Sequence, residues 1–250
     1  MLNWRISYEQ TEIEQVSGVQ AAIHDWLHSE DLLPLLAEEM EVIIALDRKA
    51  SECNKEGIIQ LRTPLTRYAK GFGEQPWVMD NGSFSNFKEN TFSTMAQDGM
   101  YDPSCKWIAL PDVVGDHEKT LELFQEWDEK LCKHYIPLRP HFKKWAFVVQ
   151  DGATIQSIPW DEIVAVFLGG TDRMKRSRTA FRIMRHAKKL GKWVHIGRVN
   201  TKKWVEYWFW TADSIDGSGL AKYDHMLEDA MKEISRLRKY PEMPTIEDFL

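Results

Sequence analysis

The stretch AVFLGGTDRMKRSRTAFRIMRHAKKLGKWVHIGRVN, from Ala165 to Asn200, decides the fold class of this chain. It begins with a short apolar run that ends in Gly-Gly, continues through a helical segment from Arg173 to Leu190, and reaches a second apolar run after Gly191. A glycine directly after the last apolar residue is a common helix end. Two strands separated by a helix predict a parallel βαβ unit.

The same pattern recurs along the chain, with further helical segments expected at Asp116–Lys133 and Tyr223–Leu237. Eight apolar runs have the length of strands: Glu41–Leu46, Gly57–Leu61, Trp77–Asp80, Trp107–Asp112, Trp145–Asp151, Ala165–Gly170, Lys192–Arg198 and Ser214–Gly219. Eight such units predict an α/β protein with a single, minimal (β/α)8 TIM barrel over residues 41–250. Residues 1–40 are expected to form an N-terminal helical extension. An open doubly wound sheet is the alternative, but no glycine-rich phosphate-binding motif follows the first strand.

Composition places the chain among soluble globular proteins. Charged residues make up 28% of its 250 residues, and aromatic residues make up 12%, including 11 Trp, which excludes membrane and disordered classes. The first residues lack the apolar core of a signal peptide, and no apolar run is long enough to span a bilayer. Three widely spaced cysteines predict neither a disulfide framework nor a zinc site, so we expect a cytoplasmic protein: Cys53, Cys105 and Cys132.

The net charge of −6 conceals a strong asymmetry. Residues 173–203 contain 12 Lys and Arg and no Asp or Glu, so the remaining 20 basic and 38 acidic residues give the rest of the chain a charge of −18. Most of such a protein repels a polyanion, and one face attracts it. A solvated basic helix with no ligand is the alternative interpretation.

The ends of the apolar runs carry the candidate chemistry. In five of these runs the last apolar residues lead into a polar or glycine residue: Asp80, Asp112, Gln150, Gly169-Gly170 and Asp216. In a TIM barrel these ends meet at one rim, where active sites form. Each acid alone is better explained as a helix cap or turn residue, but the set together indicates a site.

Carboxylates clustered in a partly desolvated pocket separate each other's pKa values, so that one stays ionised while another carries a proton. Glycosidic bond cleavage through an oxocarbenium-like transition state needs such a pair. Asp, Gln and closely approaching glycine backbone also suit a purine, which presents both hydrogen-bond donors and acceptors.

The order of these motifs resembles one family. From Trp77 to Asp216 the chain resembles the tRNA-guanine transglycosylase superfamily, and most of all its phage and bacterial DNA-guanine transglycosylase branch, deoxypurine-in-DNA protein A. The motifs that carry the resemblance are MDNGSF (79–84), ALPDVVGD (109–116), VVQDG (148–152), FLGGT (167–171), HIGRVN (195–200) and ADSIDG (212–217).

The resemblance implies a TIM-barrel pentosyltransferase that exchanges guanine in DNA, or in RNA, for a free 7-deazaguanine base through a covalent sugar-enzyme intermediate. It implies that Asp216 is the nucleophile and Asp80 the general acid and base. The residues expected to hold the base are Asp112, Gln150, Asp151, Gly169 and Gly170. The residues expected to contact phosphates are Arg173, Lys175, Arg176 and Arg198.

The resemblance also bears on cofactors and location. The tRNA enzymes carry a zinc site of three cysteines and one histidine after the nucleophile, whereas no cysteine follows Cys132 here, so we expect no metal and no cofactor. The 7-deazaguanine base is a co-substrate. The branch implies a bacterial or phage-infected host cytoplasm and no membrane partner.

Several residues have competing interpretations. Asp213 is the rival nucleophile to Asp216. His195 is expected to point into the barrel or to hydrogen-bond a carbonyl group. His117 and Glu118 are expected in the first turn of a helix and not as ligands. An aromatic cluster is expected to pack a helix in place and not to stack bases: Trp204, Tyr207, Trp208, Phe209 and Trp210.

Two other functions remain open from the sequence. A base-releasing N-glycosylase would use the same residues, with water in place of the incoming base. A non-catalytic DNA-binding relative would need the basic segment but not the acids.

Overall fold

The computed structural model describes residues 43–47, 53, 55–65, 76–83, 87–135 and 143–239. Eight parallel strands in these residues pair in chain order, and the last pairs with the first, so the sheet closes into a barrel. The strands are β1 (Ile43–Leu46), β2 (Ile58–Arg62), β3 (Trp77–Met79), β4 (Cys105–Ala109), β5 (Trp145–Val149), β6 (Ala165–Leu168), β7 (Trp193–Ile196) and β8 (Ser214–Asp216). The TIM barrel expected from the sequence is confirmed, whereas the expected extension at residues 1–40 lies outside the described residues.

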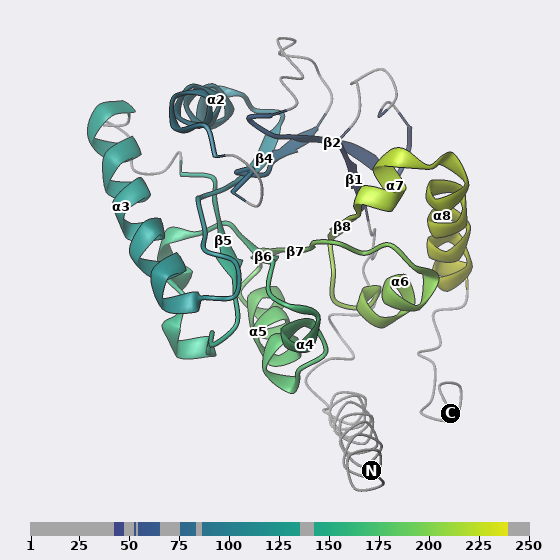
Figure 1. Cartoon of the computed structure of the whole chain (residues 1–250). Coiled ribbons are helices and arrows are strands. Elements are labelled where there is room, and N and C mark those ends of the chain that lie inside the picture. Colours follow the sequence, from purple (N-terminus) through teal and green to yellow (C-terminus); the bar gives the residue numbers. More distant parts are fainter. Residues whose placement is uncertain are drawn as a thin grey trace, which may run out of the picture.

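Helices surround the strands in Figure 1. The α-helices are α2 (Glu89–Tyr101), α3 (His117–Tyr135), α4 (Asp172–Lys175), α5 (Arg178–Lys189), α6 (Lys202–Trp208), α7 (Ser218–Lys222) and α8 (Asp224–Lys239). Two short 3-10 helices, η4 (Ile155–Ser157) and η5 (Trp160–Glu162), connect β5 to β6. Among the described residues, no helix has the length and apolar character needed to cross a bilayer.

Every second side chain along a strand points into the barrel, and these side chains fill its interior. On β5, Ala146 and Val148 join the inner apolar cluster, and their neighbours in sequence join the outer cluster that packs against the helices. Four alanines inside the barrel leave room for large rings there, namely Trp107 and Phe167, with Trp193 packed against them. The interior is therefore a packed core, and a site can form only at its ends.

One expected helix is wrong in its extent. The segment Arg173–Leu190 is not one helix, because α4 ends at Lys175 and α5 begins at Arg178. Ser177 between them has extended backbone, and its side chain accepts a hydrogen bond from the N–H of Ala180. Ser177 is therefore an N-cap that starts a second helix. Gly191 has φ +66°, as expected of a helix end.

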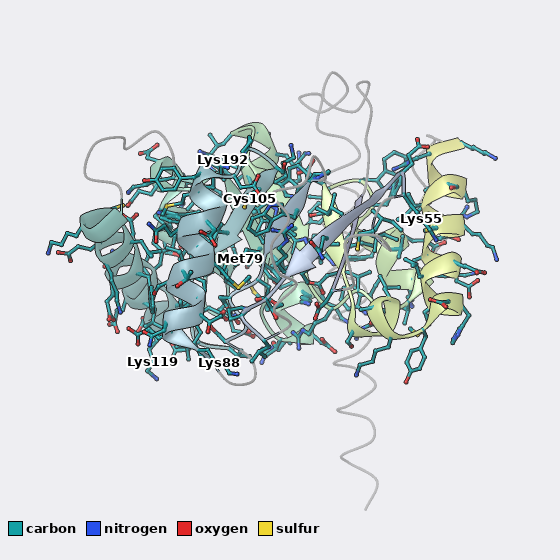
Figure 2. The ribbon with its side chains drawn as sticks, turned by 90° about the horizontal axis from the view of Figure 1, so that it is seen from above. Lys55, Met79, Lys88, Cys105, Lys119 and Lys192 are labelled. Carbon is teal, nitrogen blue, oxygen red and sulfur yellow. The ribbon has the colours of Figure 1, made fainter. Side chains whose placement is uncertain are left out.

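The two rims of the barrel are distinguishable in Figure 2. Lys88 and Lys119, at the starts of α2 and α3, lie along one edge, and Lys192, directly before β7, lies along the opposite edge. Helices that follow strands begin at the carboxyl ends of those strands. The edge with Lys88 and Lys119 is therefore the rim where an active site is expected.

Candidate active site

Side-chain alternation brings the predicted residues to this rim. The apolar cluster inside the barrel includes Val78, Val148 and Phe167. Ser214 also points inward, where it hydrogen-bonds the buried His195. Two residues further along each strand come Asp80, Gln150, Gly169 and Asp216, which therefore share the inward direction at the carboxyl ends.

Asp216, on β8, is held from several sides. Its Oδ2 atom lies 3.0 Å from Nε2 of His195, and its Oδ1 atom accepts the backbone N–H of Arg198 at 2.8 Å. Burial alone raises the pKa of Asp216, but His195, the Arg198 N–H and the nearby Lys175 ammonium outweigh burial and lower it. The side chain is 14% exposed, so an ionised carboxylate is presented at the rim.

Asp80, directly after β3, has the opposite electrostatic character. Its Oδ1 atom accepts a hydrogen bond from the N–H of Gly82, in its own turn, at 3.1 Å. Burial, followed by the negative charges of Asp216 and Asp112, raises the pKa of Asp80 to about 7. The two carboxylates therefore favour different protonation states at neutral pH, which is the condition for one to act as nucleophile and the other as acid and base.

Asp112, after β4, belongs to an amide network. Its Oδ1 atom accepts from the amide of Asn81 at 2.8 Å, and its Oδ2 atom accepts from the amide of Gln150 at 2.7 Å. The Gln150 Oε1 atom accepts the N–H of Gly115, and Asn81 also donates to the carbonyl of Leu110. Burial raises the pKa of Asp112 although both amides lower it. Gln150 and Asn81 therefore fix the orientation of the Asp112 carboxylate.

The Gly169-Gly170 segment packs tightly beside this network. A Cβ atom at Gly169 would lie 2.7 Å from the Nε2 atom of Gln150 and 2.7 Å from a methyl group of Val148. The Arg198 guanidinium donates to the carbonyl of Gly169 at 2.9 Å and to that of Gly170. Glycine at position 169 is thus required for the close approach of the loop to the predicted base site.

Arg198 connects the glycine loop to Asp216. Among the described residues it is the only non-glycine residue with positive φ, at 60°. This sparsely populated conformation directs its N–H to Asp216 while its side chain reaches Gly169 and Gly170. Arg198 is exposed, as expected of a phosphate contact, but its observed contacts are to the loop and the carboxylate.

Two predicted site residues have other roles here. Lys175 is only 2% exposed, and its ammonium donates to the carbonyl of Gly197, so we correct its assignment as a phosphate contact. Burial and the Arg198 charge lower the pKa of Lys175 to about 8. Asp151 accepts the N–H and hydroxyl of Thr171 at 2.7 and 2.5 Å, which favours a role in fixing this loop over contact with a base.

The other predicted phosphate contacts lie at the surface. Arg173 and Arg176 are exposed on α4 and directly after it. The Arg176 guanidinium lies 5.4 Å from the ring centroid of Trp204. Of the aromatic cluster on and after α6, Trp208 and Phe209 are buried, and the others pack half-buried against the core, as expected.

The rival nucleophile lies elsewhere. Asp213 precedes β8, forms an ion pair with Lys188, and accepts the N–H of Val194 at 2.7 Å. It therefore lies at the opposite end of β8 from Asp216. His195 points into the barrel as expected, but its partners are the Asp216 carboxylate and the Ser214 hydroxyl and not a carbonyl. The sequence offered a partial signal for this pair, because His195 lies in the apolar run Lys192–Arg198 and Asp216 lies in the next run, Ser214–Gly219.

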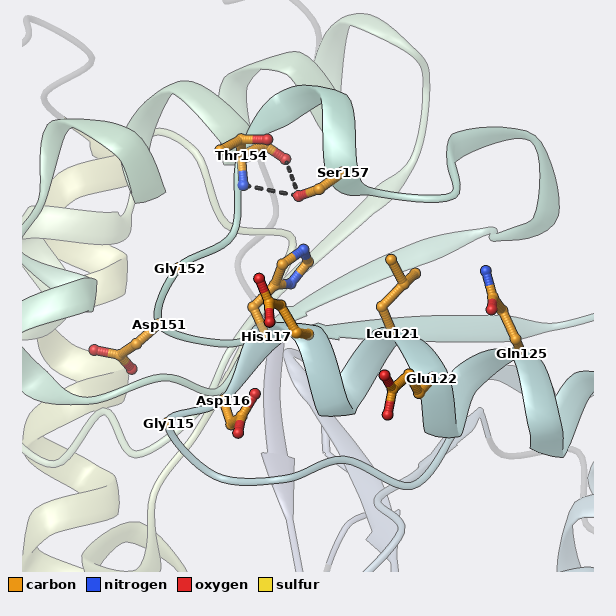
Figure 3. A pocket seen from close by; sticks show the side chains of 11 residues that line it. Gly115, Asp116, His117, Leu121, Glu122, Gln125, Asp151, Gly152, Thr154 and Ser157 are labelled. Atoms are coloured by element: carbon orange, nitrogen blue, oxygen red, sulfur yellow. Dashed lines mark hydrogen bonds between the residues drawn. The ribbon is translucent and has the colours of Figure 1, made fainter.

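A separate pocket of about 590 Å³ lies beside the rim, at the start of α3 (Figure 3). Its lining includes Asp116, Glu118 and Glu122, and none of Asp80, Asp112 or Asp216 lines it. His117 and Glu118 lie in the first turn of α3, as expected. His117 is 5% exposed, and neither ring nitrogen has a hydrogen-bond partner among the described groups.

Comparison of the chain with protein-family models gives no match, and comparison with curated proteins gives no significant match. Within the described residues, no group of three or more His, Cys, Asp or Glu side chains is arranged to hold a metal ion. All three cysteines carry free thiols.

Proposed function

We propose that this chain is a DNA-guanine transglycosylase, which exchanges guanine in DNA for a free 7-deazaguanine base without cutting the strand. The single observation that carries the proposal is the electrostatic division between Asp216, which has a lowered pKa, and Asp80, which has a pKa of about 7. The two groups are close enough for the charge of Asp216 to raise the pKa of Asp80.

In the first displacement, the target nucleotide leaves the base stack, because its C1′ atom is inaccessible within the duplex. An oxygen of Asp216 bonds to C1′ while the bond from C1′ to guanine N9 breaks and its electron pair moves onto the base. Asp80 donates its proton to the departing guanine. The product is a sugar ester on Asp216 and an ionised Asp80.

In the second displacement, a 7-deazaguanine occupies the same place. Asp80 removes the proton from its N9 atom, N9 bonds to C1′, and the ester bond breaks to regenerate the Asp216 carboxylate. A pKa near 7 suits Asp80 for both proton transfers at neutral pH.

The amide network supports recognition of a purine. Asn81 and Gln150 each satisfy one oxygen of Asp112, and each carboxylate oxygen keeps further acceptor capacity for the N–H groups of a guanine edge. Arg173 and Arg176 lie exposed near the glycine loop, where phosphates that flank an extruded nucleotide would pass. The acidic remainder of the protein limits polyanion contact to this face.

The deciding experiment incubates the protein with duplex DNA, single-stranded DNA or RNA, together with labelled guanine or candidate 7-deazaguanines, and analyses nucleosides by mass spectrometry. We expect label to enter DNA of unchanged length, and Asp216→Asn to abolish incorporation. Asp213→Asn is the matched control, because Asp213 lies at the other end of β8, and it is expected to retain exchange.

Other outcomes would replace the proposal. Abasic sites formed without added base would identify an N-glycosylase. DNA binding that weakens with salt, with no exchange and no base release in any condition, would identify a non-catalytic binding protein.

A further inference from the structure

A chain of hydrogen bonds leads to Asp216 from inside the barrel. His195 is fully buried on β7, and the register pairs it with Ser214, so it lies one level below the rim. Its Nδ1 atom lies 2.8 Å from the Ser214 hydroxyl, and its Nε2 atom lies 3.0 Å from Asp216 Oδ2. The indole N–H of Trp193 donates to the same hydroxyl at 2.7 Å.

The chemistry of these partners fixes the direction of the bond from Trp193 and of the bond to Asp216. The indole N–H of Trp193 can only donate, and an ionised carboxylate can only accept. Nε2 of His195 must therefore carry the proton that it shares with Asp216. In the tautomer with its proton on Nε2 alone, Nδ1 accepts from Ser214, whose oxygen already accepts from Trp193 and whose hydrogen is available to donate.

The imidazole has no freedom to turn away. Its ring centroid lies 4.9 Å from that of Trp107 and 4.6 Å from that of Phe167, and the Phe167 contact is edge-on. Rings on two sides and a directed hydrogen bond at each nitrogen hold one orientation and one tautomer. A buried histidine that only filled space in the core would not require hydrogen-bond partners aligned with both ring nitrogens.

We propose that His195 is a positioning residue for the nucleophile, and that its Nε2–H holds the Asp216 carboxylate ionised and oriented through both displacements. This inference rests on the proposed function and deepens it. When C1′ bonds to Asp216, the carboxylate loses its negative charge. When the ester breaks, the charge returns to an oxygen that already faces a donor, which favours release of the sugar.

Other charged groups that surround Asp216 act together with His195. Lys175 from α4 and the backbone N–H of Arg198, in the loop after β7, favour the ionised form of Asp216. Asp80 is the acidic group that interacts with the charge of Asp216, and Asp112 is a second acidic group that acts on Asp80. His195 is the side chain that donates a direct hydrogen bond to Asp216 in the described part of the chain, so its removal is the most direct perturbation of Asp216.

The test compares His195→Leu, which removes the donor, with His195→Gln, whose amide can still donate. The pH profile of kcat/KM for base exchange reports the ionisation of Asp216 on its acidic side. Loss of a hydrogen bond to a charged group is expected to move this acidic limb upward by about one to two pH units in His195→Leu. His195→Gln is expected to restore at least half of that shift. His225→Leu, on the exposed surface of α8, is the matched control and is expected to keep the wild-type profile.

A second measurement is independent of activity. Carbon-13 NMR of labelled aspartate carboxyl groups follows the titration of Asp216, which is assigned by its absence in Asp216→Asn. We expect the Asp216 midpoint to rise in His195→Leu. Ser214→Ala, which keeps the imidazole but removes the partner of Nδ1, provides a milder variant if His195→Leu does not fold, and it is expected to shift the midpoint in the same direction by less.

The outcomes separate the two proposals. If Asp216→Asn keeps exchange activity, the proposed function fails, whatever the His195 variants do. If Asp216→Asn is inactive but the acidic limb and the NMR midpoint are unchanged in His195→Leu, or in Ser214→Ala where that variant is used, the role of His195 is overturned. Equal shifts in His195→Leu and His195→Gln would also overturn it, because ring shape and not the N–H would then matter.

Discussion

Replacing Asp80 by Asn is expected to stabilise the protein at pH 8 while it slows base exchange. The asparagine carbonyl can still accept the N–H of Gly82, so the local turn is retained. What the substitution removes is a carboxylate whose negative charge the site disfavours, through burial and through the charges of Asp216 and Asp112. Loss of a general acid and base is expected to slow exchange by roughly 10²- to 10⁴-fold.

The magnitude of the stability effect follows from the pKa of Asp80, which is about 7 in the folded protein against an ordinary value of 3.8. When folding raises the pKa of a group, binding of its proton stabilises the folded state, and this stabilisation is fully present below the unfolded-state pKa. It is lost as the pH rises through the folded-state pKa. Across the two units from pH 5 to pH 7 the folded protein holds the proton and the unfolded chain does not. Each pH unit in this range lowers the free energy of unfolding of wild type by about 1.36 kcal/mol, which gives about 2.7 kcal/mol over the two units. Asp80→Asn does not undergo this loss.

Urea unfolding of both proteins at pH 5 and pH 8 measures this difference, because titrating groups that are not coupled to Asp80 contribute equally to each protein. The free energy of unfolding of Asp80→Asn, relative to wild type, is expected to be higher at pH 8 than at pH 5 by that amount. Asp229→Asn, a change of an exposed carboxylate on α8, is the control and is expected to show no such difference. A relative stability of Asp80→Asn that is the same at both pH values, or lower at pH 8, would refute the electrostatic division.

Three further predictions concern the same rim. Asp216→Asn is expected to reduce exchange by roughly 10³-fold or more and, because it removes a negative neighbour, to lower the pKa of Asp80 in carbon-13 NMR titrations. Gly169→Ala places a methyl group 2.7 Å from neighbouring side chains, and is expected to raise KM for the free base about tenfold, measured by steady-state exchange. The double variant Arg173→Ala/Arg176→Ala is expected to weaken the salt dependence of DNA binding. The slope of the logarithm of the binding constant against the logarithm of the salt concentration should fall by about 0.9 for each phosphate that the two arginines neutralise in wild type. Fluorescence anisotropy with labelled DNA measures this slope.

The fold was predictable because its signal is local and repeated. Each apolar run followed by polar or glycine residues marks a strand and its carboxyl end, and eight such units favour the closed barrel, which the structure has, over an open doubly wound sheet. The predicted helix Arg173–Leu190 fails where a local signal was missed, since Ser177 is a capable N-cap within an otherwise helical pattern. Lys175, the last residue of α4, is buried and donates to the carbonyl of Gly197, a contact that the local sequence pattern did not indicate.

The approach of the three acids to one another was predictable, but their hydrogen-bond partners were not. That Asp80, Asp112 and Asp216 meet follows from their positions at strand ends. That Asn81 would bind Asp112, and that Asp151 would bind Thr171, depends on side-chain rotamers and loop geometry across strands far apart in sequence. Spacing along the chain carries no information about such contacts, so base-binding and loop-fixing residues look alike in the sequence.

The different protonation of Asp80 and Asp216 has its origin in what lies beneath and beside each strand end. The neighbouring strand β7 supplies His195, which lies one level below Asp216. The loop after β7 supplies the backbone N–H of Arg198, which reaches Asp216 because Arg198 adopts positive φ. Asp80 receives backbone hydrogen bonds from its own turn and faces two carboxylates. A single proton shared by this group of acids therefore resides on Asp80 and leaves the negative charge on Asp216. The difference between the pKa values of Asp80 and Asp216 follows from strand order and register. Exchanging the chemical roles of the two acids would therefore require a strand next to β3 that supplies hydrogen-bond donors, as β7 does for Asp216, and not only a different residue at position 80.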